Sequence, residues 1–374
     1  MANKVRNTPK PQNVLAKENQ VNQKITKGIL PALPSFVADY DKSLDRKGRS
    51  VKTRLAYVTD ISHFLEYMIA DTGLSEAKTV KEITLEDMNR LKGRDVNDYL
   101  SFAKNHENDD GTIVVNGKDA LARKKSSIAG LLKFLYREDL IEYDITEKID
   151  AISVKQTDRI VKTLEENEVM DMLDAVTTGE PLTPHQKKYW EKTKYRDKFI
   201  ITLFVIAGLR ISELQQLNIS SFNLKREEFI IYRKRGKEAV MPMNKTLVQG
   251  FKEYMEFDRA HCTDIAPGHE DALFLSLSAK RKAKDGKTVP QGRKRLSVNQ
   301  IRALVHTYTS AAVGGTGVSP HKLRATAATT AIRRGNDISK VASLLDHDNI
   351  QTTTRYININ MDDKRSVLES IDRE

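Results

Sequence analysis

Apolar residues recur at intervals of three or four positions through most of this chain, which is the spacing of one face of an α-helix. The clearest case is the segment 50–71. Five of its apolar residues share one stripe, namely Leu55, Val58, Ile61, Leu65 and Met68. Similar spacing predicts further helices at 33–44, 88–106, 120–141, 164–176, 244–261 and 297–313, and two helices joined by a turn at Gly208 within 195–217. The pattern therefore favours a mainly α fold with little β-structure.

A few short segments depart from the helical spacing. FIIYRKRGKEAVMPM at 229–243 has two apolar runs around a basic Arg-Gly-Lys turn, which predicts a β-hairpin. ALFLS at 272–276 predicts a short buried strand, and the polar stretch at 107–120 predicts a loop with a small hairpin. Residues 178–194 predict a loop, whereas TLED, beginning at Thr84, is a capping signature that marks a helix start. The predicted fold class is mainly α with a small antiparallel β-sheet (α+β).

Changes in composition divide the chain into five parts. Residues 1–30 are polar and net basic, which predicts a flexible tail that is either disordered or weakly helical. An all-helical domain follows at 31–150, and a linker without clear periodicity at 151–163. A second, mainly helical domain with the small sheet covers 164–358, and an amphipathic tail follows at 359–374. We therefore expect two folded domains between two tails.

The chain is strongly basic. Its 374 residues carry a formal net charge of +11, which favours a polyanionic partner such as nucleic acid. Cys262 is the only cysteine, so an intrachain disulfide and a cysteine-based zinc site are excluded. No run approaches the roughly 18 apolar residues of a membrane span, and the N-terminus lacks the apolar core of a signal peptide. We expect a soluble intracellular protein that is not associated with a membrane.

The segment 319–356, SPHKLRATAATTAIRRGNDISKVASLLDHDNIQTTTRY, gathers histidines, arginines and a tyrosine. His321 and Arg324 are three residues apart, so on a helix they share one face. Without a carboxylate cluster, such groups suit a phosphate diester better than a metal ion. Tyr356 can serve as a nucleophile. Arg324, together with Arg210 in GLRISEL, can bind the two non-bridging oxygens through its planar fork.

Each of these residues also has an ordinary structural explanation. A lone tyrosine near the end of a chain is usually part of the core or the surface, and Arg210 could form a surface salt bridge. His321 could cap a helix, and His347 could lie at a helix C-terminus as a cation. Two histidines could also ligate a metal, but neither an i, i+4 spacing nor a nearby carboxylate pair supports a metal site.

Four segments together carry a resemblance to a known family. AGLRISEL, RKRGKEAVMPM, HKLRATAAT and LLDHDNIQTTTRYI resemble, in order and spacing, the signature boxes of the tyrosine recombinase (phage-integrase) family. The resemblance covers about residues 160–360, and the helical domain before them is similar to the family's core-binding (SAM-like) DNA-binding domain in length and position. It implies a site-specific DNA recombinase that cleaves and rejoins strands through a 3′-phosphotyrosyl intermediate and a Holliday junction, without cofactor or metal.

The resemblance also implies a role for each residue of the catalytic set. Arg210 and Arg324 would clamp the scissile phosphate. His321 would contact the same phosphate and assist proton transfer, and His347 would hydrogen-bond it as the second histidine. Tyr356 would attack the phosphorus and form the covalent intermediate.

The remaining positions of the boxes are less regular. Lys234 would protonate the leaving 5′ oxygen, although Lys237 in the same basic turn stays open as an alternative. Glu213 matches an acidic position that orients the pocket. The sequence departs from the family pattern at Ala325, where histidine is common, and at Asp346, where glycine is common.

Duplex DNA carrying a recombination site is the implied partner. The predicted DNA-contacting residues are basic or hydroxyl side chains, namely Arg123, Lys124, Lys125, Ser126, Lys237, Lys282 and Arg293. The family also implies a homotetramer on DNA, with accessory DNA-bending proteins as further partners. The tail at 359–374 would dock either on a neighbouring subunit or on its own domain.

Two other functions are alternatives to the recombinase. A type IB topoisomerase shares the arrangement of Arg, Lys, Arg, His and Tyr, and a DNA-binding protein with a decayed site is the alternative without enzyme activity. The HKLR box and the amphipathic tail favour a recombinase. Within the family, the short basic tail leans towards a Xer-like enzyme that resolves chromosome dimers, and a mobile-element integrase stays open.

Overall fold

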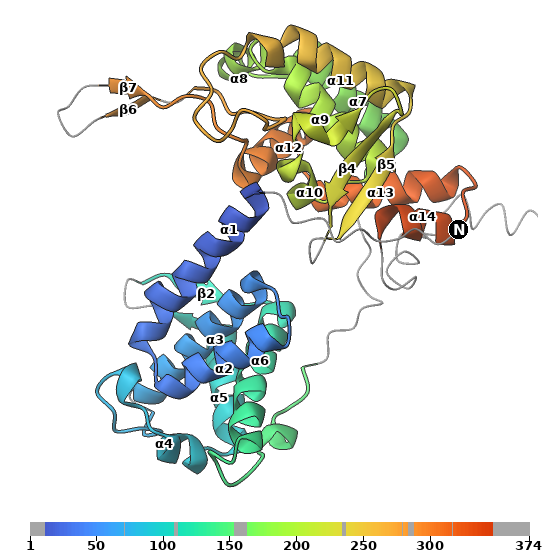
Figure 1. Cartoon of the computed structure of the whole chain (residues 1–374). Helices are drawn as coiled ribbons and strands as arrows, with labels where there is room; N and C mark the ends of the chain where they lie inside the picture. The colour runs from blue at the N-terminus through green and yellow to red at the C-terminus, as the bar shows by residue number, and fades with distance from the viewer. Residues whose placement is uncertain are drawn as a thin grey trace, which may run out of the picture. The chain divides into compact units, whose positions relative to one another are not determined.

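The computed structural model of the chain describes residues 12–70, 72–107, 111–152, 163–233, 237–278, 280–282, 288–315 and 317–346. These residues form two compact units, one before and one after residues 153–162 in the sequence (Figure 1). Both units consist mainly of α-helices with small antiparallel sheets, so the predicted fold class is confirmed. The predicted linker lies largely outside the described residues, and the predicted tail at 359–374 lies wholly outside them.

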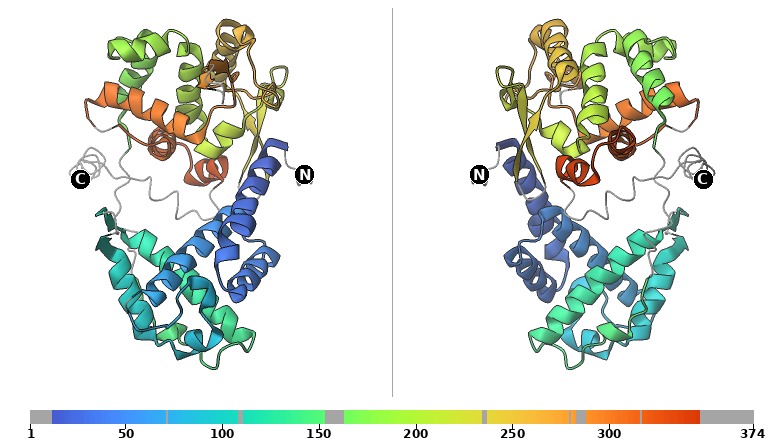
Figure 2. Two further views of the ribbon diagram at one scale, coloured as in Figure 1. Left: turned by 90° about the vertical axis from the view of Figure 1, so that its left-hand side faces the viewer. Right: turned by 90° about the vertical axis from the view of Figure 1, so that its right-hand side faces the viewer.

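The first unit is helical apart from one short hairpin (Figure 2). Its α-helices are α1 (Gln12–Gln23), α2 (Ser35–Arg46), α3 (Val51–Ile69), α4 (Leu85–Arg90), α5 (Gly93–Lys104) and α6 (Lys118–Arg137). Short π or 3₁₀ turns occur at Lys24–Ile29, Leu30–Ala32, Val80–Glu82 and Thr146–Lys148. Strands β1 (Asn105–Glu107) and β2 (Ile113–Val115) pair antiparallel, which gives the small hairpin expected near the polar loop.

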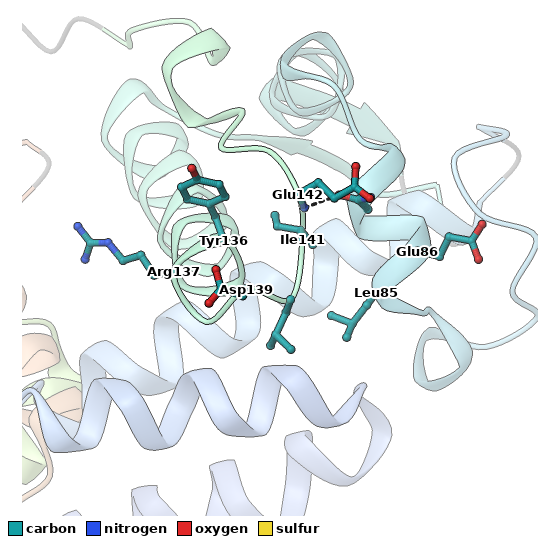
Figure 3. Close-up of a pocket in the computed structure, with 9 residues that line it drawn as sticks. Leu85, Glu86, Tyr136, Arg137, Asp139, Ile141 and Glu142 are labelled. Carbon is teal, nitrogen blue, oxygen red and sulfur yellow. Dashed lines mark hydrogen bonds between the residues drawn. The ribbon is translucent and has the colours of Figure 1, made fainter.

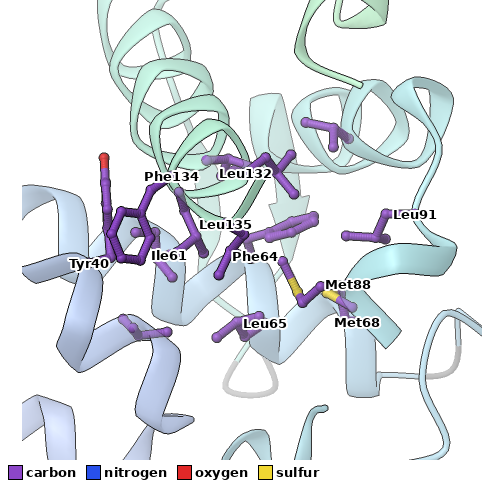
Figure 4. Packing of buried hydrophobic residues seen from close by; sticks show 14 of the residues in the cluster. Tyr40, Ile61, Phe64, Leu65, Met68, Met88, Leu91, Leu132, Phe134 and Leu135 are labelled. Carbon is purple, nitrogen blue, oxygen red and sulfur yellow. The ribbon is translucent and has the colours of Figure 1, made fainter. Parts of the chain in front are cut away.

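The core of the first unit lies largely between α3 and α6. Ile61, Phe64 and Leu65 of α3 are fully buried, as is Leu132 of α6 (Figure 4). The α3 residues are three and four positions apart, so the helix presents one apolar face to α6. The Phe64 ring meets the Tyr99 ring of α5 edge-on, with the centroids 5.2 Å apart. The stripe predicted for this helix therefore builds the core.

The second half of the predicted tail is helical and packed against the first unit, and is therefore not flexible. Residues from Gln12 onward form α1 and the π turn at Lys24–Ile29, and both lie against α3. Ile25 is fully buried in the core of the first unit. Burial of one large apolar side chain contributes roughly 1.5–3 kcal/mol, so a polar segment with one such anchor can still be ordered. Residues 1–11 lie outside the described residues.

The predicted capping signature at Thr84 is confirmed. The Thr84 hydroxyl accepts a hydrogen bond from the Asp87 N–H at 3.2 Å, and the Asp87 carboxylate accepts one from the Thr84 N–H at 2.8 Å. This reciprocal pair satisfies backbone donors that the first turn of α4 would otherwise leave without a partner.

The second unit combines helices with a three-stranded sheet. Its α-helices are α7 (Glu166–Thr178), α8 (Pro184–Trp190), α9 (Lys194–Ala207), α10 (Ile211–Gln216), α11 (Lys245–Phe257), α12 (Val298–Val313), α13 (Pro320–Arg333) and α14 (Ile338–Leu345). The sheet has the order β3 (Phe222–Asn223), β4 (Glu228–Tyr232), β5 (Glu238–Pro242), all antiparallel. Short 3₁₀ turns lie at Ile219–Ser221 and Arg259–His261, and β6 (Lys280–Lys282) pairs with β7 (Thr288–Pro290). The hairpin predicted at 229–243 is therefore confirmed.

Helix α9 lies at the centre of the second unit. Its consecutive residues Phe199, Ile200 and Ile201 are buried, as are Leu203 and Phe204. A helix that is apolar on every side must be surrounded by other elements, and α9 contacts α7, α11 and α13. The chain then turns at the end of α9 into α10, which starts the candidate site.

Two local predictions for the second unit are wrong. The predicted loop at 178–194 contains helix α8, and the indole N–H of Trp190 at its end donates to the Val176 carbonyl at 2.8 Å. The helix begins with Thr183 as its cap and a proline in its first turn, a start signal that the polar composition concealed. The predicted strand at 272–276 is buried as expected but forms only isolated bridges, one to Asn218 and one to Arg295.

Gly208 ends α9 in a left-handed conformation with φ of 58°. A Cβ atom at this position would lie 2.7 Å from Cδ2 of Leu345, closer than a side chain tolerates. We expect Gly208→Ala to lower the free energy of unfolding by about 2 kcal/mol or more, from left-handed strain and the clash together. Denaturant titration measures this loss.

Gly314 provides the matched control for that substitution. It also caps a helix with a positive φ, of 66°, but a Cβ there would meet nothing within 4 Å. Gly314→Ala should therefore cost only the left-handed strain of about 1 kcal/mol. Equal losses at the two positions would contradict the close packing between Gly208 and α14.

Candidate active site

The C-terminal end of α14 gathers three arginines from three different segments. Arg233, Arg324 and Arg210 donate, in that order, to the successive main-chain carbonyls of Leu344–Asp346. The donor–acceptor distance is 2.7 Å for Arg233 and 3.1 Å for Arg210. The last carbonyls of a helix have no partner within the helix and carry the negative end of its dipole, so they attract cations. One helix end thus fixes three guanidinium groups.

Arg210 is held at the start of α10 by Glu213. The Glu213 carboxylate accepts one hydrogen bond from the Arg210 main-chain N–H and a second from its guanidinium, each at 2.8 Å. The Glu213 side chain is almost fully buried, whereas that of Arg210 is 33% exposed. Glu213 therefore fixes one side of the Arg210 guanidinium, and the exposed side is accessible to an anionic ligand.

Arg324, in contrast, is a buried residue of α13. Its guanidinium donates to the Gly208 carbonyl at 2.5 Å, besides its bond to the carbonyl of Leu345. The same guanidinium lies 3.8 Å from Glu213. Arg210 and Arg324 therefore share one buried carboxylate, and the two arginines predicted from the sequence lie at one site.

The Asp346 carboxylate lies among cations from two other elements. It is 3.2 Å from the Arg233 guanidinium, 3.4 Å from the Lys237 ammonium and 3.7 Å from the Arg210 guanidinium. Partial burial acts to raise the pKa of this carboxyl, but the charges and hydrogen bonds of Arg233 and Lys237 lower the pKa below its ordinary value. Asp346 is therefore ionised at neutral pH, and it adopts a left-handed conformation with φ of 53° as the cap of α14.

His321 lies in the first turn of α13, one turn before Arg324. Desolvation of its ring, together with the positive charges of Arg324 and Arg210, lowers the pKa of His321 below the ordinary value for histidine. The imidazole is therefore mostly neutral at pH 7 and can both accept and donate a hydrogen bond. The structure thus brings His321, Arg324, Arg210 and Glu213 together.

Three of the predicted catalytic residues lie outside the described residues, namely Lys234, His347 and Tyr356. Their sequence neighbours Arg233 and Asp346 are described, and both belong to the cluster at the end of α14. Lys237, the alternative lysine, is 59% exposed and contacts Asp346. The choice between Lys234 and Lys237 therefore stays a prediction.

The other predicted DNA contacts of the second unit fall in different surroundings. Arg293 forms an ion pair with Asp264, with a distance of 2.8 Å between the guanidinium and the carboxylate. Lys282 belongs to β6, but its side chain is outside the described part of the structure. These contacts stay predictions.

Three of the residues predicted to contact DNA from α6 have at least partly exposed side chains. Ser126 is exposed, and Arg123 is exposed while its guanidinium pairs with Asp60 and fixes its direction. Lys125 is partly buried and donates to the Ile149 carbonyl at 3.2 Å.

Lys124, the fourth residue of α6 predicted to contact DNA, is buried, so this prediction is wrong for Lys124. It is only 7% exposed, and its ammonium lies 3.7 Å from the buried carboxylate of Asp60. Lys124 stands three residues after Leu121 and four before Ile128, both buried. Helical spacing therefore places Lys124 on the apolar stripe of α6, where its charge needs an internal partner.

A basic pocket on the first unit was missed by the sequence interpretation. It has a volume of about 250 Å³, and its charged lining residues are Lys47, Arg49, Lys133, Arg137 and Glu138. Ser126 also lines it, four and seven residues before Gly130 and Lys133 on one face of α6. The cations Lys133 and Arg137 could have been found by extending the spacing of Arg123 and Ser126 further along the helix.

A second hollow of the first unit has the opposite charge. It has a volume of about 750 Å³ and lies between α4 and the end of α6 (Figure 3). Glu86, Asp139 and Glu142 line it, against the single cation Arg137. Three carboxylates disfavour phosphate, so this hollow is a poor candidate for DNA.

Arg233 was also missed as a site residue. In a strand, alternate side chains point to the same face, so Phe229 and Ile231 share a face with Arg233. Phe229 and Ile231 are buried, and the Arg233 side chain is only 7% exposed. The period-two spacing of the hairpin sequence was therefore the signal that Arg233 points inward.

Replacing Glu213 with glutamine should destabilise the second unit. The substitution removes the charge that Arg210 and Arg324 share, and leaving a buried ion without its partner typically costs about 3–5 kcal/mol. We expect a fall of about 3 kcal/mol in the free energy of unfolding, measured by denaturant titration. Glu228 pairs with Arg226 at the surface, at 3.7 Å. Glu228→Gln is the control and should change stability by less than about 0.5 kcal/mol; an equal effect of both substitutions would contradict the shared carboxylate.

Within the described ranges, no group of three or more histidine, cysteine, aspartate or glutamate side chains is placed to hold a metal ion. Among the helices in the part of the chain that the structure describes, none has the length and apolar character needed to cross a membrane.

Sequence comparison gives the family and its relatives. Residues 162–363 match the Phage integrase family, which is more than half of the chain. The chain is 29% identical over 327 residues to tyrosine recombinase XerC of Caldanaerobacter subterraneus subsp. tengcongensis, covering 84% of this chain and 79% of the relative. It is 23% identical over 372 residues to tyrosine recombinase XerS of Lactococcus lactis subsp. lactis, covering 95% of this chain and all of the relative.

Solved structures share the fold. XerH site-specific recombinase bound to a palindromic difH substrate matches over the full length of both chains, with a TM-score of 0.59 and 15% identity. The Tn1549 transposon integrase in complex with a circular intermediate DNA matches 90% of this chain and 99% of its own, with a TM-score of 0.55 and 15% identity. The resemblance inferred from the four sequence boxes is confirmed by these comparisons. The chain belongs to the phage integrase family.

Proposed function

We propose that this protein is a tyrosine-type, site-specific DNA recombinase that breaks and rejoins duplex DNA. The observation that carries the proposal is the convergence of Arg210 and Arg324 on the buried carboxylate of Glu213 and on the main-chain carbonyls at the end of α14, next to His321. Two fixed guanidinium groups and a neutral imidazole form a site for a phosphate diester, because each fork can donate two parallel hydrogen bonds. In the sequence, Tyr356 follows this cluster by ten residues.

The reaction is a transesterification in which bonds are exchanged without an outside energy source. The Tyr356 oxygen attacks the phosphorus, a tyrosyl–phosphate bond forms, and the bond to the 5′ oxygen breaks. Arg210 and Arg324 stabilise the charge that builds on the non-bridging oxygens. His321 contacts the phosphate, and its neutral ring accepts the proton that the Tyr356 hydroxyl loses. His347 donates a hydrogen bond to the same phosphate, and Lys234 gives a proton to the leaving 5′ oxygen. The reverse attack by a 5′ hydroxyl rejoins a strand.

The first unit supplies a DNA-binding face along α6. Arg123, Ser126, Lys133 and Arg137 are all exposed and are three, seven and four residues apart, so they follow one side of the helix. Lys125 of the same helix and Lys237, Lys282 and Arg293 of the second unit add contacts to phosphates. Contacts of this kind supply affinity that falls with salt and carry little sequence information.

The proposed biological role is Xer-like recombination between chromosomal sites, and integration or excision of a mobile element is the second candidate. The similarity to XerS along 95% of this chain and all of the relative favours the first role. Strand exchange between two sites engages four subunits, so we propose a homotetramer on DNA, in which the tail at 359–374 docks on a neighbouring subunit. Accessory DNA-bending proteins would assist assembly, and the work takes place on the nucleoid in the cytoplasm.

The deciding experiment uses nicked suicide duplexes that carry candidate sites from the genomic neighbourhood of the gene. A nick near the scissile bond lets the short fragment that carries the new 5′ hydroxyl diffuse away. The covalent protein–DNA complex then accumulates and is seen on a denaturing gel. We expect trapping on one sequence, with the protein linked to a 3′ phosphate. Relaxation of supercoiled plasmid without any sequence preference would instead establish a topoisomerase.

A further inference from the structure

The cluster at the end of α14 contains one anion that the proposed reaction does not use. The Asp346 carboxylate lies within 3.7 Å of Arg233, Lys237 and Arg210, and its own carbonyl accepts a hydrogen bond from Arg210. A carboxylate and a phosphate make the same kind of contact with a guanidinium. Asp346 thus makes, from within the protein, the contacts that a phosphate oxygen would make.

The surroundings of Asp346 make this contact a substantial one. Its side chain is 18% exposed, and that of Arg233 is 7% exposed, so solvent screens the pair only weakly. Arg233 and Lys237 are joined by a main-chain hydrogen bond of 2.8 Å at the turn end of the β4–β5 hairpin. The carboxylate therefore ties the β4–β5 hairpin to the end of α14 and also draws on Arg210.

The position of Asp346 does not by itself require a charged residue. Its left-handed conformation suits glycine best, and asparagine and aspartate are the other residues that adopt it routinely. Glycine and asparagine would satisfy the turn without adding a charge. The negative charge therefore needs an explanation beyond the backbone, and the three cations around it supply one.

We propose that Asp346 is an internal counterion that neutralises the phosphate-binding cations in the DNA-free protein and is displaced when the scissile phosphate binds. The inference rests on the proposed function for the identity of the phosphate. The free protein is stabilised by the ion cluster, and DNA must compete with the carboxylate for Arg210 and the hairpin cations. Asp346 thereby limits binding to phosphates presented in the correct geometry, since a loosely placed anion gains too little to displace it.

The test compares Asp346→Asn with the unaltered full-length protein, using inorganic phosphate as the probe at constant ionic strength. The midpoint of thermal unfolding is measured over a series of phosphate concentrations, because a ligand that binds the folded state raises this midpoint according to its affinity. We expect the variant to unfold at a lower temperature without phosphate and to bind phosphate about tenfold more tightly, since one neighbouring negative charge is gone.

A second readout uses duplex DNA. The variant should bind a duplex about tenfold more tightly at a fixed salt concentration, because the phosphate no longer has to displace a carboxylate from Arg210 and the hairpin cations. A variant that loses stability and also binds phosphate and DNA more weakly would show that Asp346 merely holds the fold, and the proposal would be wrong. Unchanged phosphate affinity would overturn it as well.

Two further variants complete the design. Glu253 pairs with Lys198 at 3.1 Å and its side chain is 24% exposed, so Glu253→Gln removes a comparable ion pair away from the site. It should leave phosphate affinity unchanged. Asp346→Gly also removes the carboxylate and fits the left-handed turn, so it repeats the test if the asparagine variant folds poorly. Failure of the proposed function can be told apart from failure of this inference. In the first case the unaltered protein would trap no nicked duplex, while Asp346→Asn would still bind phosphate more tightly.

Discussion

Replacing Tyr356 with phenylalanine should abolish covalent protein–DNA complexes on nicked duplexes while leaving non-covalent DNA binding unchanged. Phenylalanine keeps the ring and loses only the oxygen that attacks phosphorus, so the first bond of the reaction cannot form. Binding is retained, because its free energy comes mainly from cations that contact phosphates. Denaturing gels measure the covalent complex, and filter binding measures affinity. We expect loss of the adduct to below detection with a dissociation constant within about twofold of the unaltered protein.

The control for this substitution is Tyr189→Phe. Tyr189 is an exposed residue of α8, 52% accessible, and its ring packs against that of His185 in the same helix. The Tyr189→Phe variant should trap DNA as the unaltered protein does. A Tyr356→Phe protein that still forms covalent complexes would assign the nucleophile to another residue, and equal loss in both variants would point to a general effect on folding.

The second large effect is expected at Arg324. Lysine at this position keeps the positive charge but cannot donate to the carbonyls of Gly208 and Leu345 and to a phosphate at the same time. Removal of one fixed donor to a developing charge typically slows an enzyme by about 10²–10³-fold. We therefore expect Arg324→Lys to reduce the rate of strand cleavage by at least about a hundredfold at saturating DNA. Single-turnover cleavage of a nicked duplex measures this rate.

Arg334 near the end of the same helix is the matched control. It pairs with Glu166 at 3.2 Å, and both side chains are largely exposed, so the pair contributes little. Arg334→Lys should cleave at the rate of the unaltered protein. A rate for Arg324→Lys within a few-fold of normal would remove Arg324 from the phosphate-binding set, even if its stability has fallen.

Helix positions and the main hairpin were predictable because their signals are local. The stripe on α3 and the two apolar runs around the basic turn of β4–β5 depend on spacing within a few turns or strands. The tail was mispredicted because Ile25 gains its stability from contact with α3, which is distant in sequence. Composition alone cannot report such a contact.

The candidate site was predictable in membership but not in its connections. Arg210, Glu213, His321 and Arg324 could be named from two of the four boxes, and the structure brings them together. The acceptors that fix the arginines are main-chain carbonyls of α14, and a carbonyl is present in every residue. No sequence pattern could therefore single out Leu344–Asp346 as the point where the cations converge.

Lys124 illustrates the opposite limit. A lysine in a basic, serine-rich run looks like a solvent-exposed contact, yet its place between Leu121 and Ile128 puts it inside. The burial depends on Asp60, which lies on another helix and supplies the compensating charge. Spacing was available in the sequence, whereas the partner that makes burial tolerable was not.

The use of backbone acceptors at the end of α14 also determines which changes this site can tolerate during evolution. The exposed side chain of Leu344 can be exchanged without altering the carbonyl that Arg233 contacts, whereas Leu345 is also held by its packing in the core. A one-residue insertion or deletion within α14 is a different matter, because each residue turns the helix by about 100° and advances it by about 1.5 Å. Such a change would rotate all three acceptors away from their arginines together. Homologues should therefore vary on the exposed face of α14 but keep its length, as well as the apolar character of its buried residues Val341, Ala342 and Leu345.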